Sequence, residues 1–280
     1  VGNKDFIYNG DSIKWRKAAN ALKARYLMRL LNKSSNKTND LNEILQCIDR
    51  SFTSADEEFK FAKYDGGDQY NPLAAFSYSR QALAGSLSYA KKLKERNDPR
   101  LGQIICNVDG ELVVDPTLDD FTPRVKELAE KQSYYNYNIT NYSVTAPTQL
   151  LSYHELMFLK AEAYARLGGA ANIANAKTAL KDAIAAGFAN LENSADGAGY
   201  EIDLLSKLDT YFATYVEPLF DADPLKEIMI QKYLAFMGSS GESVEAYNDY
   251  RRLQAAGEDF ITLENPNNAA GKFPLRLVYG

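Results

Sequence analysis

Apolar residues recur every three or four positions in several stretches of the chain, a spacing that places side chains on one face of an α-helix. Residues 12–52 and residues 150–187 each contain a pair of such runs, and a short turn joins the two runs of each pair. Residues 54–149 are irregular apart from one helical run, and more helical runs follow in residues 201–280. The pattern predicts a mainly α-helical protein in which a long irregular segment separates two antiparallel helix pairs.

The two helix pairs carry start signals, turns and small packing residues. Asp11 or Ser12 can cap the first helix by accepting hydrogen bonds from free backbone N–H groups. In the second pair a Gly-Gly turn at 168–169 separates runs with small residues at the expected contact, which resembles a tetratricopeptide unit. We expect Tyr164 and Leu180 in the core of this pair. The face of the first helix that is expected to be buried consists of Trp15, Ala18, Ala19, Leu22, Tyr26 and Leu30.

Glycine, proline and β-branched residues define the remaining segments. Gly-Gly and Asn-Pro in residues 63–77 predict a loop. Asp-Gly at 109–110 lies between two β-rich runs, which is a strong signal for a β-hairpin. A glycine-rich loop is expected at 194–199. The helices expected after it lie at about 201–216, 224–237 and 242–255.

Charge and composition exclude several classes of function. The net charge is −5 and the basic residues are spread along the chain, whereas nucleic-acid binding needs clustered lysines and arginines. No apolar run approaches the roughly 20 residues that span a bilayer. The one histidine, His154, has no partner at metal-ligand spacing, so it is expected to be solvent-exposed or to cap a helix. We therefore expect no nucleic-acid partner, no metal, no cofactor and no catalytic residue.

Short blocks in a fixed order along nearly the whole chain resemble the motifs of the SusD/RagB family. The most specific part is Gln231-Lys232 followed by the run from Tyr247 to Arg252. In this run Asp249 can form a bidentate ion pair with Arg251 or Arg252 that fixes the helix to a neighbour. The blocks are GDSIKWRKAANALKARYLMRL (10–30), NDPR (97–100), YHELMFLKAEAYARLG (153–168), PLKEIMIQKYLAFMGSSGESVEAYNDYRRL (224–253) and FPLRLVY (273–279).

The resemblance implies a nutrient-binding protein of the bacterial cell surface. Family members most often bind oligosaccharides, with peptides as another possible ligand class, and cover a SusC-like TonB-dependent transporter in the outer membrane. Family chains are longer and begin with a lipidated cysteine. Residues 1–280 are therefore expected to form a single SusD/RagB-like domain that lacks its N-terminal part, with the lipid anchor upstream of this segment.

The resemblance also directs attention to the irregular segment, where the family often places aromatic residues that contact the ligand. The stretch SYYNYNITNY (133–142) lies there. Tyrosine offers a flat apolar face and a hydroxyl group, and asparagine offers a donor and an acceptor, which suits a sugar ring. The same composition also suits a twisted edge strand with exposed tyrosines. The candidate ligand-binding residues are Tyr134, Tyr135, Tyr137, Asn138 and Tyr142, with Tyr64, Asp68 and Tyr70 in a second loop.

Two other functions are compatible with the sequence. A tetratricopeptide scaffold would bind only protein and would lack a tyrosine-lined cleft. An all-α glycoside hydrolase could use Asp65 and Asp68 as its acids, because glycoside cleavage needs a pair of carboxyl groups. Aspartates in glycine-rich loops are also common turn formers. A pair of carboxyl groups at the spacing that glycoside cleavage requires would favour the hydrolase over a binding protein.

Overall fold

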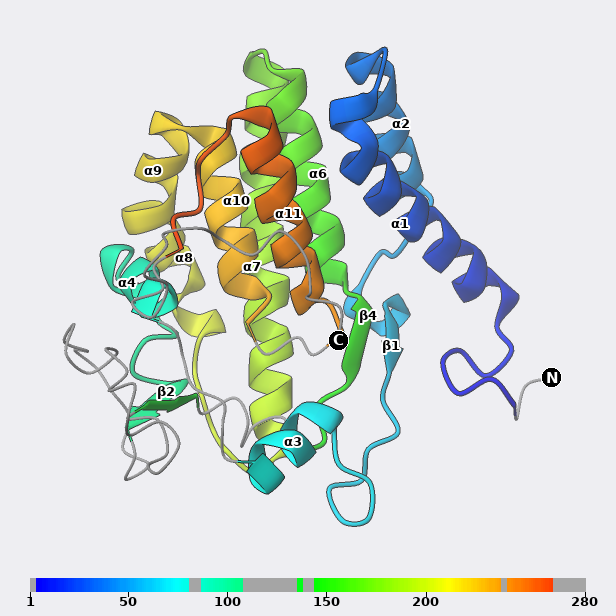
Figure 1. Ribbon diagram of the computed structural model, residues 1–280, viewed down its shortest axis with the longest axis vertical. Coiled ribbons are helices and arrows are strands. Elements are labelled where there is room, and N and C mark those ends of the chain that lie inside the picture. The colour runs from blue at the N-terminus through cyan, green and yellow to red at the C-terminus, as the bar shows by residue number, and fades with distance from the viewer. Residues whose placement is uncertain (1–3, 81–86, 108–134, 138–143, 238–240, 264–280) are drawn as a thin grey trace, which may run out of the picture.

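The computed structural model describes residues 4–80, 87–107, 135–137, 144–237 and 241–263. These residues form a mainly helical protein with small antiparallel sheets (Figure 1), which confirms the predicted fold class. The α-helices are α1 (Ser12–Leu30), α2 (Lys37–Asp49), α3 (Pro72–Arg80), α4 (Leu87–Glu95), α6 (Tyr153–Leu167), α7 (Ala170–Gly197), α8 (Leu208–Tyr211), α9 (Glu217–Ala222), α10 (Pro224–Ala235) and α11 (Ser243–Ala256). The strands are β1 (Phe59–Phe61), β2 (Ile105–Asn107), β3 (Tyr135–Tyr137) and β4 (Thr148–Leu151).

Helices α1 and α2 form one pair, and α6 and α7 form another (Figure 1). Helix α2 packs on α6, and α6 packs in turn on α10, so the helices form a stack. The core of this stack includes Leu180, which is fully buried as expected, and the ring of Tyr164 packs partly buried against it. The two predicted helix regions thus correspond to neighbouring layers of one core.

Helix α1 begins where the sequence predicts, because the Asp11 carboxylate accepts hydrogen bonds from the backbone N–H groups of Ile13 and Lys14 at 2.8 and 3.1 Å. Its buried face differs from the expected one. Trp15, Tyr26 and Leu30 remain 41%, 52% and 61% exposed, and Ala19 is exposed too. The buried side chains are Ala18, Ala21, Ala24, Arg25 and Met28.

The reason for this difference is that α1 has two apolar faces. The alanine face allows the closely packed contact with α2, since small side chains let two helix backbones approach. Periodicity detects an apolar face, but it does not identify which face meets a partner. The larger aromatic and leucine side chains of α1 therefore lie on the other side of the helix.

The turn between α6 and α7 consists of Gly168 and Gly169, with φ of 70° and 82°. Residues with a side chain rarely adopt this left-handed conformation, so glycine suits both positions. Helix α7 continues to Gly197, and the glycine-rich loop that was expected at 194–199 is wrong for most of its length. Leu191 and Ala195 are buried on the same face as the earlier core residues, and this packing extends the helix.

Ion pairs connect α6, α10 and α11. The Arg252 guanidinium donates to both Glu162 carboxylate oxygens at 2.7 and 2.9 Å and to Asp249 at 2.9 Å. Lys232 of α10 pairs with Asp249 at 2.6 Å. Because Glu162 is fully buried, the two arginine hydrogen bonds compensate the loss of water around a charge. The bidentate pair that was expected for this motif is thus made by Arg252 with Glu162.

The strands form two small antiparallel pairs, β1 with β4 and β2 with β3. Strand β2 supplies the first run of the predicted hairpin. The turn at 109–110 and the run after it lie outside the described residues. The described partner of β2 is β3, which comes from the tyrosine-rich stretch.

Candidate functional site

The tyrosine-rich stretch is described only at its centre. Tyr134, Asn138 and Tyr142 lie outside the described residues. Tyr135 and Tyr137 belong to β3, where their backbones pair with Asn107 and Ile105 of β2. Regular pairing of this kind fits an edge strand as well as a binding surface, so the ligand role of these tyrosines stays a prediction.

The second candidate loop was predicted within residues 63–77, and in the structure it spans residues 62–71, between β1 and α3, with a turn that is built by Asp65. One carboxylate oxygen of Asp65 accepts hydrogen bonds from the N–H groups of Gly67 and Gln69 at 2.9 and 2.8 Å. The backbone N–H of Asp65 donates back to the Gln69 carbonyl at 3.0 Å. These hydrogen bonds from Gln69 and Gly67 lower the pKa of Asp65. A general acid in glycoside cleavage needs a raised pKa, so Asp65 is suited to shaping the turn and unsuited to that role.

Tyr64 holds this loop against β4. Its hydroxyl group lies 2.7 Å from the Thr148 hydroxyl group, and its ring meets Phe61 edge to face with centroids 5.1 Å apart. Asp68 is exposed, and the Tyr70 side chain is 42% exposed. Of the three residues predicted in this loop, Tyr64 therefore anchors it, whereas Asp68 and Tyr70 are accessible to a ligand.

Asn71 closes the loop and joins it to the segment that follows the tyrosine-rich stretch. Its backbone N–H donates to Val144 at 3.0 Å, and its side-chain amide donates to the Ala146 carbonyl at 2.8 Å. Its side-chain oxygen accepts from Leu73 at 2.8 Å, at the start of α3. The loop that was predicted for 63–77 is thus wrong from Pro72 onward, because Pro72 opens a helix at the position that tolerates proline best.

Gly66 brings the loop into close contact with residues 144–146. Its φ is 71°, and an added Cβ atom would lie 3.0 Å from a methyl carbon of Thr145 and 3.2 Å from one of Val144. The Thr145 hydroxyl group donates to the Gly197 carbonyl at 2.9 Å, at the end of α7. The loop is therefore fixed to both β4 and α7.

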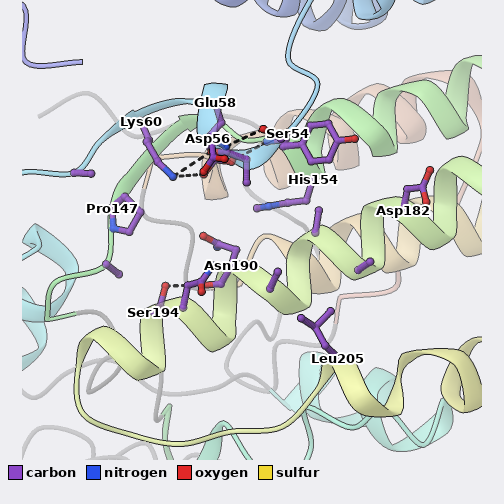
Figure 2. A pocket seen from close by; sticks show the side chains of 18 of the residues that line it. Ser54, Asp56, Glu58, Lys60, Pro147, His154, Asp182, Asn190, Ser194 and Leu205 are labelled. Atoms are coloured by element: carbon purple, nitrogen blue, oxygen red, sulfur yellow. Dashed lines mark hydrogen bonds and ion pairs between the residues drawn. The ribbon is translucent and has the colours of Figure 1, made fainter. Parts of the chain in front are cut away.

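A cleft of about 730 Å³ adjoins this loop, and its lining includes Ala62 of the loop and Thr145, which lies beside Gly66. Figure 2 shows it between the start of β1 and β4 on one side and α7 on the other. Alanines at 185, 186 and 189 form its helical wall, with Asp182 and Asn190 on the same helix. Lys60 and Tyr153 contribute from the opposite side.

The polar groups of the cleft are held by one another. Glu58 accepts hydrogen bonds from Lys60 at 2.9 Å, from Gln149 at 3.1 Å and from the backbone N–H of Tyr153 at 2.9 Å. Gln149 also donates to the Asn190 side chain at 3.0 Å. Burial and the nearby Asp182 raise the pKa of the Tyr153 hydroxyl group, which stays protonated. This arrangement can form hydrogen bonds with a ligand through preorganised groups.

His154 differs from its sequence-based expectation. It is 1% exposed, and Ser152 rather than His154 caps α6 by accepting from the Glu155 N–H at 3.0 Å. The sequence contains the signal for this cap, because Ser152 and Glu155 have the spacing of a capping box. His154 faces the buried Glu242, which comes from a distant segment and which periodicity could not identify.

A second cavity of about 490 Å³ lies between α4 and the segment Glu217–Glu227 of α9 and α10. Its inner charges are paired, with Arg96 and Glu227 joined at 2.8 Å. Lys92 donates to the Thr262 carbonyl at 2.6 Å. The Arg96–Glu227 pair joins the end of α4 to α10, and the Lys92 hydrogen bond fixes Thr262 to α4, so a structural role accounts for both contacts.

Two broader features concern the whole described part of the chain. No helix in these residues is both long and apolar enough to cross a membrane. Within the same residues no group of three or more His, Cys, Asp or Glu side chains has an arrangement that could hold a metal ion.

Comparison with known proteins identifies the family. A family model described as starch-binding and associating with the outer membrane matches residues 1–280. No curated protein matches the sequence. A solved SusD/RagB family protein from Bacteroides thetaiotaomicron shares 41% identity at a TM-score of 0.87, over 100% of this chain and 61% of that chain.

More distant structures share the fold. A chitin-binding protein is 22% identical at a TM-score of 0.71, over 99% of this chain and 60% of that chain. A SusD homologue from Bacteroides fragilis is 23% identical at a TM-score of 0.64, over 91% of this chain and 58% of that chain. The chain thus spans about three fifths of the length of these relatives. Because the family model matches all of residues 1–280 and a solved member is 41% identical, this chain belongs to the SusD-like family.

Proposed function

We propose that the protein binds a nutrient oligosaccharide at the surface of the outer membrane and passes it to a SusC-like TonB-dependent transporter. The family description, starch-binding and associating with the outer membrane, supports the ligand class and the location. A lipid anchor upstream of this segment would hold the protein at the membrane. The observation in this chain that carries the proposal is the fixed loop 62–71, which exposes Tyr70 and Asp68 and whose first residue, Ala62, lines a cleft.

The chemistry of this loop suits a sugar. The ring of Tyr70 can stack on the apolar C–H face of a sugar ring, and the Asp68 carboxylate can accept hydrogen bonds from its hydroxyl groups. The loop is tied down by Asp65, Tyr64 and Asn71, so ligand binding need not pay the entropy of ordering it. The strand residues Tyr135 and Tyr137, with Tyr134, Asn138 and Tyr142, would extend the same surface.

Calorimetric titration of the full-length protein tests this proposal. The probes are starch-derived and chitin-derived oligosaccharides, with a peptide mixture as the other ligand class. We expect Tyr70→Ala to weaken binding about fivefold, since one aromatic stacking contact contributes about 1 kcal/mol. Tyr215→Ala is the matched control, because Tyr215 is comparably exposed on a helical segment outside the loop. Equal affinity of the two variants and the unchanged protein would remove loop 62–71 from the site.

Binding without catalysis is part of the proposal. The hydrogen bonds that lower the pKa of Asp65 disfavour the glycoside hydrolase alternative. Incubation of the full-length protein with the bound oligosaccharide should release no reducing ends above background. Steady release that Asp68→Asn abolishes would show an enzyme instead. A tetratricopeptide scaffold would bind the transporter or another protein while giving no heat with any sugar.

A further inference from the structure

The cleft between α7 and the start of β1 and β4 has one wall that is a single face of α7; we call it the α7 cleft. Its residues on α7 recur at three- and four-residue steps from Asp182 to Ser194, which places them on one face. At a rise of about 1.5 Å per residue this face is about 18 Å long, so the cleft is an elongated groove. Small side chains, the alanines at 185, 186 and 189, form its middle (Figure 2). The volume of about 730 Å³ is within the range of about 300–1,000 Å³ that ligand sites have.

One segment of the chain joins the α7 cleft to the loop that exposes Tyr70. The wall opposite α7 includes Thr145 and Ala146. Asn71, next to Tyr70 in the chain, donates its side-chain amide to the Ala146 carbonyl at 2.8 Å. Gly66 of the loop lies against Thr145. The loop and the cleft are thus held on the same segment, and a chain-like ligand bound at one can extend to the other.

The polar groups of the cleft suit an uncharged sugar. Burial and the nearby Asp182 raise the pKa of the Tyr153 hydroxyl group, so it stays protonated and can donate a hydrogen bond. The Asp182 carboxylate is an acceptor. The Asn190 oxygen accepts from Gln149 at 3.0 Å, which leaves the NH2 group of Asn190 available as a donor. These donors and acceptors, with the alanines beside them, match the hydroxyl groups and the apolar C–H face of a sugar ring.

The charges of the cleft oppose an acidic sugar. Among the described residues that line it, Lys60 is the one lysine or arginine, and it pairs with Glu58 at 2.9 Å. Burial lowers the pKa of His154, so this side chain adds no positive charge near neutral pH. Asp56 and Asp182 are exposed in the lining. A carboxylate or sulfate group on a ligand would therefore meet like charges and would lose water without a cation to pair with.

We propose that the α7 cleft is a second binding region, in which uncharged units of an oligosaccharide chain lie along α7, and that it excludes acidic glycans. This inference rests on the proposed function, because it extends the ligand that is bound at loop 62–71. A disaccharide that stacks on Tyr70 contacts the loop alone. A longer chain contacts the loop and the cleft, so affinity rises with chain length.

Calorimetric titration of the full-length protein tests the length requirement. The probes are maltose and maltohexaose, with chitobiose and chitohexaose as the second series. The unchanged protein should bind the hexasaccharide of one series at least about tenfold more tightly than its disaccharide. Ala186→Leu fills the middle of the cleft and should remove this difference while it keeps the affinity for the disaccharide. Ala174→Leu, the same change at an exposed position of α7 outside the cleft, should retain the difference.

The possible failures are distinguishable. Equal affinity of the unchanged protein for the two lengths, or tight hexasaccharide binding that persists in Ala186→Leu, would overturn the cleft and leave the proposed function standing. The absence of heat with every sugar would refute the proposed function, and this extension with it. Melting temperatures of the two leucine variants show whether both are folded.

The exclusion of acidic glycans has a separate test that needs no change in the cleft. The probes are the hexasaccharide that binds and its derivative in which the C6 hydroxyl groups are oxidised to carboxylates. The derivative should bind at least about tenfold more weakly at low salt, and the gap should narrow as salt screens the charges. Asp182→Asn should narrow the gap as well, whereas Asp49→Asn, at an exposed position of α2 outside the cleft, should leave it unchanged. Equal affinity for the two probes at low salt would overturn the exclusion.

Discussion

The Nε2 atom of His154 and the Oε2 atom of Glu242 lie 3.6 Å apart in the interior, and neither has a hydrogen-bond partner within the described part of the chain. Burial and the neighbouring Glu155 raise the pKa of Glu242 well above its usual value. Burial lowers the pKa of His154. Arg25, 3.7 Å from Glu242, is shared with Glu155. Burial therefore favours the uncharged form of both groups, in which the carboxyl group of Glu242 holds the proton and the imidazole of His154 is neutral.

The first prediction concerns this pair. The pKa of Glu242 is raised in the folded state, so above about pH 4.5 this group holds more protons in the folded protein than in the unfolded chain. The free energy of unfolding therefore falls as pH rises above that value. Glu242→Gln cannot ionise, so its stability relative to the unchanged protein should increase between pH 5 and pH 8. Denaturant unfolding at several pH values measures this difference. Glu201→Gln removes the same charge from an exposed site and should show a flat difference. A flat difference for Glu242→Gln would contradict the assignment of the proton.

The second prediction concerns the ion pairs between α6 and α11. Arg252→Ala leaves the fully buried Glu162 with only Arg166, at 2.7 Å. Breaking a buried ion pair from one side costs about 3–5 kcal/mol, so we expect a large fall in melting temperature. The adjacent Arg251→Ala changes an exposed arginine that lies over the Tyr247 ring and should cost less than about 1 kcal/mol. Similar melting points for both variants would contradict a structural role for the pair.

The third prediction separates two neighbouring glycines. Gly66→Ala places a Cβ atom on a backbone with φ of 71° and against Thr145, which should cost about 1–2 kcal/mol and disturb the loop. At Gly67 the nearest atom would be 3.8 Å away, so Gly67→Ala should be nearly neutral. Melting temperature measures the cost, and titration with the preferred oligosaccharide measures the loop. If binding is retained in Gly66→Ala while the melting point falls, the loop is not part of the site.

The fourth prediction tests the core of the second helix pair. Leu180 is fully buried in α7, so Leu180→Ala should cost about 2–5 kcal/mol. Leu219 is 39% exposed, and Leu219→Ala should cost clearly less. Urea unfolding of the two variants gives the comparison. Equal costs would mean that α7 packs differently from the arrangement described.

The candidate site shows how far residue types alone can lead. Glycine and asparagine signals identify loop 62–71, and the tyrosines in it and in the later stretch suggest a sugar. The sequence does not distinguish Tyr64, which bonds to Thr148 of a strand 84 positions later, from Tyr70, which is exposed. Nor does it show that the Asp65 carboxylate accepts hydrogen bonds within the turn, because this depends on where the backbone places the N–H groups of Gly67 and Gln69. Contacts between distant segments decide these roles.

The sequence by itself determines most of the long helices and the Gly168-Gly169 turn, and it contains the caps at Asp11 and Ser152, because hydrophobic period, capping and turn formation are local properties. It indicates neither α3 nor the C-terminal end of α7. Only the tertiary structure decides which apolar face of α1 is buried, since Ala18 and Leu30 lie on faces that periodicity cannot rank. It also buries His154 against Glu242, which lies 88 positions later in the chain. Burial and pairing arise from packing of distant segments, and the free energy of that packing is not contained in any single stretch of the chain.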